Sequence, residues 1–249
     1  MFVGLRDLRR GFRRFVLLGV VVALVGLLST VLSGLATGLV TDGISGLRTL
    51  PLERLAFQPG SDATFSRSTL RDEALVPFAD IDGVEATPLG ASFVNAASSA
   101  GGPSLDLALF GVEADSFLVT RDDARAALAG PPGLVLASEL EDEGVEVGDR
   151  YTLGGSEVEL PVLGFTYAGT YGHAPIGFVA LDTWQRIQFG AGADGRFSAV
   201  ALRGGDGAAL DGAAESAGVD LLTKSQAYAG SPGYSAETMT MSLIRTFLL

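Results

Sequence analysis

The longest apolar run in the chain covers residues 15–40 and contains no charged side chain. At 1.5 Å per residue a helix over this run would be about 39 Å long, whereas the hydrocarbon core of a bilayer is about 30 Å thick. The apolar run of a signal peptide has only about 7–15 residues. We therefore expect residues 15–40 to form a retained transmembrane helix, although residues 34–36 (GLA) would also suit a cleavage site.

A basic segment, residues 1–14, precedes this run and carries one acid against five arginines. The arginines are Arg6, Arg9, Arg10, Arg13 and Arg14. Arginines beside a membrane span stay in the cytoplasm, so these residues set the topology. The N-terminus is expected in the cytoplasm, and the part of the chain after the span is expected outside the cell membrane.

Within residues 1–14 the apolar side chains Leu5, Leu8 and Phe12 recur at helical spacing, with the arginines between them. This pattern predicts an amphipathic helix that lies on the cytoplasmic surface of the membrane. Its apolar stripe is our candidate for a cytoplasmic interface. The alternative is a charge cluster that only directs insertion.

The predicted span has small side chains at a spacing of four, namely Thr30, Gly34 and Gly38. Small residues at this spacing let two helix backbones approach closely. We expect these positions to pack against another transmembrane helix, in the same chain or in a second copy. The alternative is chance, because glycine is common in membrane spans.

After the span, short apolar runs indicate strands and three segments indicate helices. The predicted strands cover residues 106–112, 133–138, 151–153, 158–165, 176–181, 197–203 and 219–223, and the predicted helices cover residues 124–129, 182–188 and 208–217. These elements alternate without a regular βαβ period. Residues 41–235 are therefore predicted to form a mixed α+β domain outside the membrane, with its own hydrophobic core.

Several local signals refine this prediction. Residues 154–156 (GGS) predict a β-hairpin, and Pro161 in its second strand predicts an edge strand. Thr120 and Asp123 predict a capping box in front of the helix at 124–129. Asp182 is predicted to cap the helix that runs to residue 188.

The last segment, residues 236–249, is apolar from Met239 onward and follows the helix-start residues Ser235 and Glu237. We expect it to be the start of a second transmembrane helix that the sequence cuts off. The alternative is an amphipathic tail.

Charge and composition exclude several classes of function. The net charge is −12, and the part after residue 14 carries 12 basic and 28 acidic groups. Such an acidic domain does not suit nucleic acid, which needs a basic surface. The chain has no cysteine, so the external domain has no disulfide framework.

No motif predicts catalysis or a cofactor. The only histidine, His173, is not accompanied by a nucleophile motif. His173 could ligate iron together with Tyr167 and Tyr171, but a single histidine in a loop is more often structural. The acidic residues at 139–149 lack calcium-loop spacing and predict a solvated face. Lys224 lacks the glycines of a phosphate-binding loop. We expect no enzyme, no cofactor and no metal site.

Several phrases of the sequence are similar to FtsX-like (MacB-type) ABC transporter permeases. These are residues 5–10 (LRDLRR) before the span, residues 111–117 (GVEADSF), and residues 133–138, 144–153 and 158–165 in that order. Residues 34–39 and 65–68 resemble the DevC-like exporters within that family. The resemblance covers the whole chain, which would correspond to the N-terminal part of a four-span permease.

The resemblance implies a MacB-like periplasmic domain and a permease subunit of an exporter or mechanotransmission complex. It also implies a cytoplasmic ABC ATP-binding subunit and a second permease chain as partners, in addition to membrane lipid. The competing hypothesis is a single-pass, membrane-anchored binding or sensor protein. A third, an anchored hydrolase, would require His173 to be essential.

Overall fold

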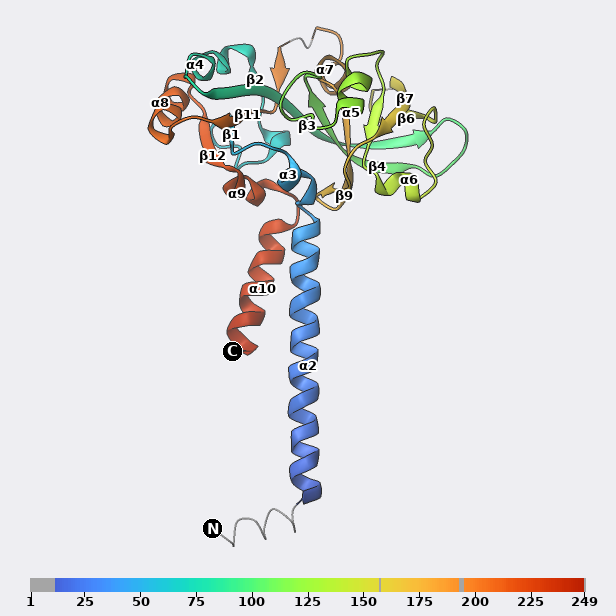
Figure 1. Cartoon of the computed structure of the whole chain (residues 1–249), viewed down its shortest axis with the longest axis vertical. Coiled ribbons are helices and arrows are strands. Elements are labelled where there is room, and N and C mark those ends of the chain that lie inside the picture. The colour runs from blue at the N-terminus through green and yellow to red at the C-terminus, as the bar shows by residue number, and fades with distance from the viewer. Residues whose placement is uncertain (1–11, 157, 193–194, 249) are drawn as a thin grey trace. The chain divides into compact units, whose positions relative to one another are not determined.

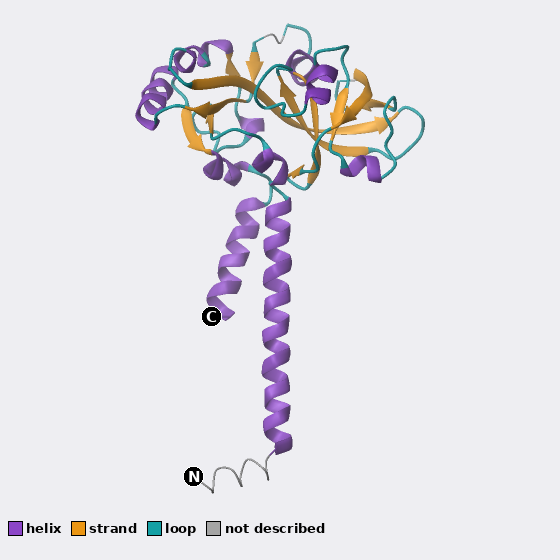
Figure 2. Cartoon of the chain, viewed as in Figure 1, coloured by secondary structure: helices purple, strands orange, loops and turns teal. Residues whose placement is uncertain are grey.

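The computed structural model describes residues 12–156, 158–192 and 195–248. The chain divides into two compact units, of which one comprises Met1–Thr41 and Ala236–Leu249 and the other comprises Asp42–Ser235. The backbone is drawn in Figure 1 and coloured by secondary structure in Figure 2. We call the unit Asp42–Ser235 the domain.

Helix α2 (Phe12–Asp42) contains the predicted span and is, among the described residues, the one helix long and apolar enough to cross a membrane. It begins at Phe12, so Arg13 and Arg14 belong to its first turn. Residues 1–11 lie outside the described part of the chain, and with them Leu5, Leu8, Arg6, Arg9 and Arg10. The amphipathic helix at residues 1–14 therefore stays a prediction.

Helix α10 (Tyr234–Leu248) covers the segment in which a second membrane helix was expected. It has 15 residues, which correspond to about 22 Å, less than the thickness of the hydrocarbon core. The helix is therefore confirmed, and its crossing of a membrane remains a prediction.

The domain is a mixed α+β unit, as the sequence predicted. Its strands are β1 (Arg54–Phe57), β2 (Leu70–Arg71), β3 (Val84–Ser98), β4 (Leu105–Val112), β5 (Leu134–Leu136), β6 (Arg150–Leu153), β7 (Val158–Phe165), β8 (Thr170–Tyr171), β9 (Ala174–Ala180), β10 (Arg196–Phe197), β11 (Ala199–Gly204) and β12 (Asp220–Thr223). Its helices are α3 (Ser45–Thr49), α4 (Val76–Ala79), α5 (Asp122–Leu128), α6 (Glu139–Asp142), α7 (Leu181–Phe189), α8 (Gly207–Ala217) and α9 (Lys224–Ala227), with 3₁₀ turns η1 (Phe65–Arg67), η2 (Asp72–Ala74) and η3 (Tyr228–Gly230).

The main sheet has the strand order β12-β1-β11-β3-β4-β9-β5-β7-β6. The 15-residue strand β3 pairs with β11 and β4 and, at its far end, with β6. The β3–β6 pairing joins the end of the sheet back to its middle, so β3, β4, β9, β5, β7 and β6 form a closed ring. Each of these six strands therefore has two hydrogen-bonded neighbours within the ring.

Strand β4 shows how the core is divided. Leu105, Leu107 and Leu109 pack in one buried cluster, which also contains Trp184. The alternate residues Ala108, Phe110 and Val112 pack in a second cluster with α3. Successive side chains of a strand point to opposite faces. From Leu107 to Val112 the strand is therefore buried on both sides.

Trp184 of α7 lies on two glycines that face each other across β3 and β4. Gly90 and Gly111 are direct cross-strand partners, and a Cβ at either position would collide with the Trp184 side chain. The indole N–H donates a hydrogen bond of 3.0 Å to the Ser92 hydroxyl. Because Gly90 and Gly111 have no side chains, the large aromatic ring can pack directly against the two strands.

The hairpin at residues 154–156 is confirmed by the antiparallel pairing of β6 with β7. The prediction that Pro161 marks an edge strand is wrong, because β7 pairs with β6 on one side and β5 on the other. The parallel pairing with β5 starts only at Val162. Pro161 therefore lies just outside that pairing, where its missing N–H costs no ladder hydrogen bond.

Two predicted helix caps are also wrong. Helix α5 begins at Asp122, and its N-cap residue Arg121 makes no side-chain cap hydrogen bond. Asp123 instead pairs with Arg121 and accepts from the Ala124 N–H, and these hydrogen bonds lower the pKa of Asp123 to about 2. Helix α7 begins one residue before Asp182 without a side-chain cap.

The predicted strand at residues 197–203 is divided in two at Ser198. The Ser198 hydroxyl accepts from the Ala91 N–H at 3.2 Å, and its carbonyl accepts from the Ser68 hydroxyl at 2.6 Å. Strand β10 before it pairs with β2, whereas β11 after it pairs with β1 and β3. Ser198 therefore interrupts the apolar run, so that the part before it joins one sheet and the part after it joins another.

Candidate functional site

The two ends of the domain meet at Gly43, the residue directly after α2. The Gly43 carbonyl accepts a 2.8 Å hydrogen bond from the Gly172 N–H and a 3.3 Å hydrogen bond from the Ser231 hydroxyl. Gly172 lies in the turn between β8 and β9, and Ser231 lies three residues before α10. Three segments far apart in the sequence are therefore tied to one carbonyl group. We call this arrangement the Gly43 junction.

Helix α3 follows Gly43 and is held against the β8–β9 hairpin. The Thr170 N–H donates to the Ser45 hydroxyl at 2.9 Å, and the Tyr167 hydroxyl donates to the Gly46 carbonyl at 3.2 Å. A Cβ at Gly46 would collide with Ile176 and would lie 2.9 Å from the Thr170 carbonyl oxygen. Only glycine allows the two backbones to come this close.

The far end of α3 is held by the only lysine of the chain. The Lys224 ammonium group donates to the carbonyl oxygens of Arg48 at 2.6 Å and Leu50 at 2.5 Å. Carbonyls at a helix C-terminus have no partner within the helix, and a cation there satisfies them. Burial, and then the nearby Arg48, lower the pKa of Lys224. Lys224 is thus a structural clamp on the segment that follows α2.

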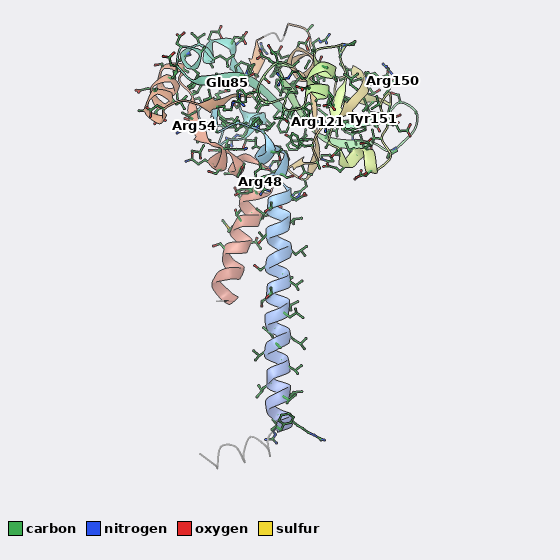
Figure 3. The ribbon with its side chains drawn as sticks, viewed as in Figure 1. Arg48, Arg54, Glu85, Arg121, Arg150 and Tyr151 are labelled. Carbon is green, nitrogen blue, oxygen red and sulfur yellow. The ribbon has the colours of Figure 1, made fainter. Side chains whose placement is uncertain are left out.

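Sequence reasoning considered Lys224 only as a phosphate ligand and missed this role. The residues around it did carry a signal. Thr223 and Gln226 form a capping box at the start of α9, with the threonine hydroxyl accepting from the Gln226 N–H. The spacing of these two residues is the usual signature of a helix start. It would have placed Lys224 in the first turn of a helix. Figure 3 labels Arg48, the residue whose carbonyl Lys224 holds.

His173 lies beside Gly172 in the β8–β9 turn and adopts a left-handed conformation, with φ of 65°. Its ring lies against Gly43, where an added Cβ would come within 3.0 Å of the ring. The same residue lines an open cavity of about 560 Å³ together with Asp42, Glu139 and Glu143. The Glu139 carboxylate accepts from the Gly169 N–H at 3.1 Å.

The tyrosines considered as iron partners of His173 have other contacts in the structure. Tyr171 packs with Phe65, Phe93 and Phe110, while Tyr167 donates its hydroxyl hydrogen bond to α3. Burial raises the pKa of both phenols, which opposes the phenolate form that binds metal. Within residues 12–156, 158–192 and 195–248 there is no group of three or more His, Asp or Glu side chains placed to hold a metal ion.

The acidic residues at 139–149 lie mostly on the surface, with Glu141, Asp142, Glu143 and Glu146 exposed. The Asp149 carboxylate accepts from the Glu146 N–H at 2.9 Å, and the Gly148 N–H donates to the Val162 carbonyl. Gly148 has φ of 98°, which suits glycine. Residues 146–149 therefore form the tight turn that leads into β6.

The predicted packing residues Thr30, Gly34 and Gly38 all lie on α2. The Thr30 hydroxyl donates to the Gly26 carbonyl at 2.8 Å, so its polar group is satisfied within the helix. No described atom would lie within 4 Å of a Cβ at Gly34 or Gly38. Phe12 is exposed in the first turn of the same helix. Packing of these residues against another helix remains a prediction.

Solved structures similar to this chain include an extracellular domain and a periplasmic region of two bacterial proteins. The extracellular domain of the noncanonical ABC-type transporter YknZ from Gram-positive bacteria is 14% identical, with a TM-score of 0.46, and the match covers 69% of this chain and 98% of that one. The periplasmic region of MacB from Actinobacillus actinomycetemcomitans is 13% identical, with a TM-score of 0.49, and the match covers 75% and 94%. The likeness is one of fold. No family model and no curated protein match the chain.

Proposed function

We propose that the chain is the transmembrane permease subunit of an ABC-type exporter or mechanotransmission complex. In this proposal α2 crosses the cell membrane with its arginine-rich end in the cytoplasm, and α10 begins a second span. A cytoplasmic ATP-binding subunit binds near residues 1–14, and a second permease chain packs along α2. The domain lies outside the cell and receives the movement of the helices.

The Gly43 junction is the observation that carries this proposal. Because Gly43 and Ser231 are hydrogen-bonded, the chain enters and leaves the domain at one place. A domain with this connection can sit between two antiparallel membrane helices without any linker of its own. The contacts of α3 with Tyr167, Thr170 and Lys224 favour transfer of a helix movement to the domain rather than its loss in a flexible loop.

The proposed ATP-binding subunit agrees with the sequence, because residues 1–249 contain no phosphate-binding loop. P-loop nucleotide binding requires a lysine within a glycine-rich turn before a helix. The single lysine of this chain, Lys224, instead holds the carbonyls of α3. We therefore expect residues 1–249 to hydrolyse no ATP, and we assign the energy supply to the proposed ATP-binding subunit.

The test is a pull-down from membranes with a tagged parent chain, followed by mass spectrometry. The proposal predicts recovery of an ABC-type ATP-binding subunit. Leu8→Glu should reduce that recovery, because it disrupts the apolar stripe of residues 1–14 and leaves every arginine in place. Val3→Glu is the matched control, since it introduces the same charge on the opposite face of the predicted helix and should leave recovery unchanged.

Two results would contradict the proposal. One is the absence of any ATP-binding subunit under conditions that preserve other transporters. The other is a coding sequence that ends near Leu249, because a permease of this family needs further apolar runs after that point. Either result would favour the membrane-anchored binding or sensor protein.

A further inference from the structure

An exposed aromatic group lies next to the Gly43 junction. Phe93 on β3 is 48% exposed and stacks on Tyr171, with ring centroids 5.8 Å apart and planes inclined by 14°. A Cβ at Gly172 would lie 3.0 Å from the tip of the Phe93 ring and 3.1 Å from Pro232. Gly172 is hydrogen-bonded to Gly43. Phe93 and Pro232 therefore sit beside the point at which the chain enters the domain.

Two tyrosines flank Ser231 in the sequence. The Ser231 N–H donates to the Tyr228 carbonyl at 3.0 Å, and the Tyr234 N–H donates to the Ser231 carbonyl at 3.2 Å. These turns bring the rings of Tyr228 and Tyr234 to a centroid distance of 6.1 Å. Both side chains are partly exposed. We call Phe93, Tyr228, Pro232 and Tyr234 the interfacial patch.

An arginine of α3 lies beside this patch. Arg48 is exposed, and its field acts on both Lys224 and Tyr228. Arg48 therefore lies close to Tyr228 of the patch, where a lipid phosphate would attract its guanidinium group. The acids of this region, Asp42, Glu139 and Glu143, line the cavity beside His173.

The depth of the junction follows from the length of the charge-free run. If residues 15–40 are centred in the bilayer, Gly43 lies about 23 Å from the midplane, or about 22 Å at a tilt of about 20°. The headgroup layer extends to about 20–22 Å from the midplane. Side chains near Gly43 that extend toward the membrane would therefore reach the outer part of the headgroup layer, where amphipathic aromatic rings are favoured.

We propose that the interfacial patch binds the headgroup layer of the extracytoplasmic leaflet and holds this end of the domain on the membrane. This inference rests on the proposed membrane topology, because it takes α2 as a span. The occupant of the patch is lipid, not another protein. The contact is non-covalent and combines burial of aromatic rings with attraction of Arg48 to phosphate groups.

The test places a tryptophan in the patch and measures its access to lipid. The chain has one native tryptophan, Trp184, which is 1% exposed and supplies a constant background. The tagged chain carrying Phe93→Trp is reconstituted in nanodiscs of phosphatidylcholine with a nitroxide on the headgroup. The nitroxide should quench most of the fluorescence that the added tryptophan contributes. Val76→Trp in α4 is the matched control, because Val76 is 59% exposed and lies far from α3 within the domain (Figure 1), and its fluorescence should persist.

A third variant separates the inference from the topology on which it rests. Leu28→Trp lies at the centre of the charge-free run and should be quenched by phosphatidylcholine brominated along its acyl chains. If Leu28→Trp is quenched and Phe93→Trp is not, the patch does not contact lipid and the inference is wrong, whereas the topology stands. If the emission of Phe93→Trp is blue-shifted but not quenched, protein covers the patch, and this result also overturns the inference. If Leu28→Trp is not quenched, the proposed topology fails and the inference fails with it.

Discussion

Three glycines of this chain are required by contacts rather than by backbone conformation. Gly90 and Gly111 make room for Trp184, and Gly46 makes room for the β8–β9 hairpin. In the sequence, Gly111 stood out only as the first residue of a phrase that resembles the permease family. The need for glycine at position 111 could not be predicted, because its neighbours Gly90 and Trp184 come from β3 and α7, which are distant in the chain.

The contact at Gly46 can be tested with a matched glycine. Gly46→Ala should lower the free energy of unfolding by roughly 1–3 kcal/mol, because the added methyl group overpacks against Ile176 and the Thr170 carbonyl. Gly212→Ala is also a helix-interior change but has no atom within 4 Å of the new Cβ, so it should stabilise by about 0.5–1 kcal/mol. Unfolding of the detergent-solubilised chain can be followed by Trp184 fluorescence. Equal effects of the two changes would show that the contact at Gly46 is unimportant.

Among the secondary elements, the sequence predicted best those whose signals are local. The β6–β7 hairpin, β4, α8 and β12 lie close to their expected positions because glycine turns and apolar periodicity mark them. Pro161 led to the wrong prediction of an edge strand, because a single proline does not show where a neighbouring strand begins. The junction of α3 with the β8–β9 hairpin left no local signal, since its hydrogen bonds join residues more than one hundred positions apart.

The element for which packing was predicted is α2. Gly34→Leu and Gly38→Leu should weaken assembly of the complex, because bulk at these positions keeps helix backbones apart. Ser29→Leu adds bulk on a different face of the same helix and is the control. Cross-linking in membranes measures assembly, and the Trp184 fluorescence should be unchanged because the domain is untouched. Equal cross-linking of Gly34→Leu, Gly38→Leu and the wild type would show that these glycines are incidental.

For the whole molecule, the sequence predicted one long apolar helix and one α+β domain, and both are present. It did not predict the ring of six strands. Ring closure depends on the pairing of Ala96–Ser98 in β3 with Leu153–Tyr151 in β6. Such a non-local pairing is determined by the packing of all six strands, so no single stretch of sequence contains it.

The orientation of the whole chain is testable by a reporter that fluoresces only in the cytoplasm. A fusion after Gly102, in the exposed loop between β3 and β4, should stay dark, whereas a fusion before Arg6 should be bright. Changing Arg9, Arg10, Arg13 and Arg14 to Glu should scramble the orientation, because the arginine bias beside the first span sets it. A bright fusion after Gly102 in the otherwise unchanged chain would reverse the proposed topology.

The hydrogen bond between Ser231 and Gly43 has a consequence for how such a gene could change. A region whose first and last residues are neighbours can be gained, lost or exchanged as a cassette while the helices on either side keep their places. Replacing residues 44–230 by a short turn would leave a plain helical hairpin. A related external cassette could be grafted onto the same two positions. The two helices and the domain of such a protein are therefore free to evolve at different rates.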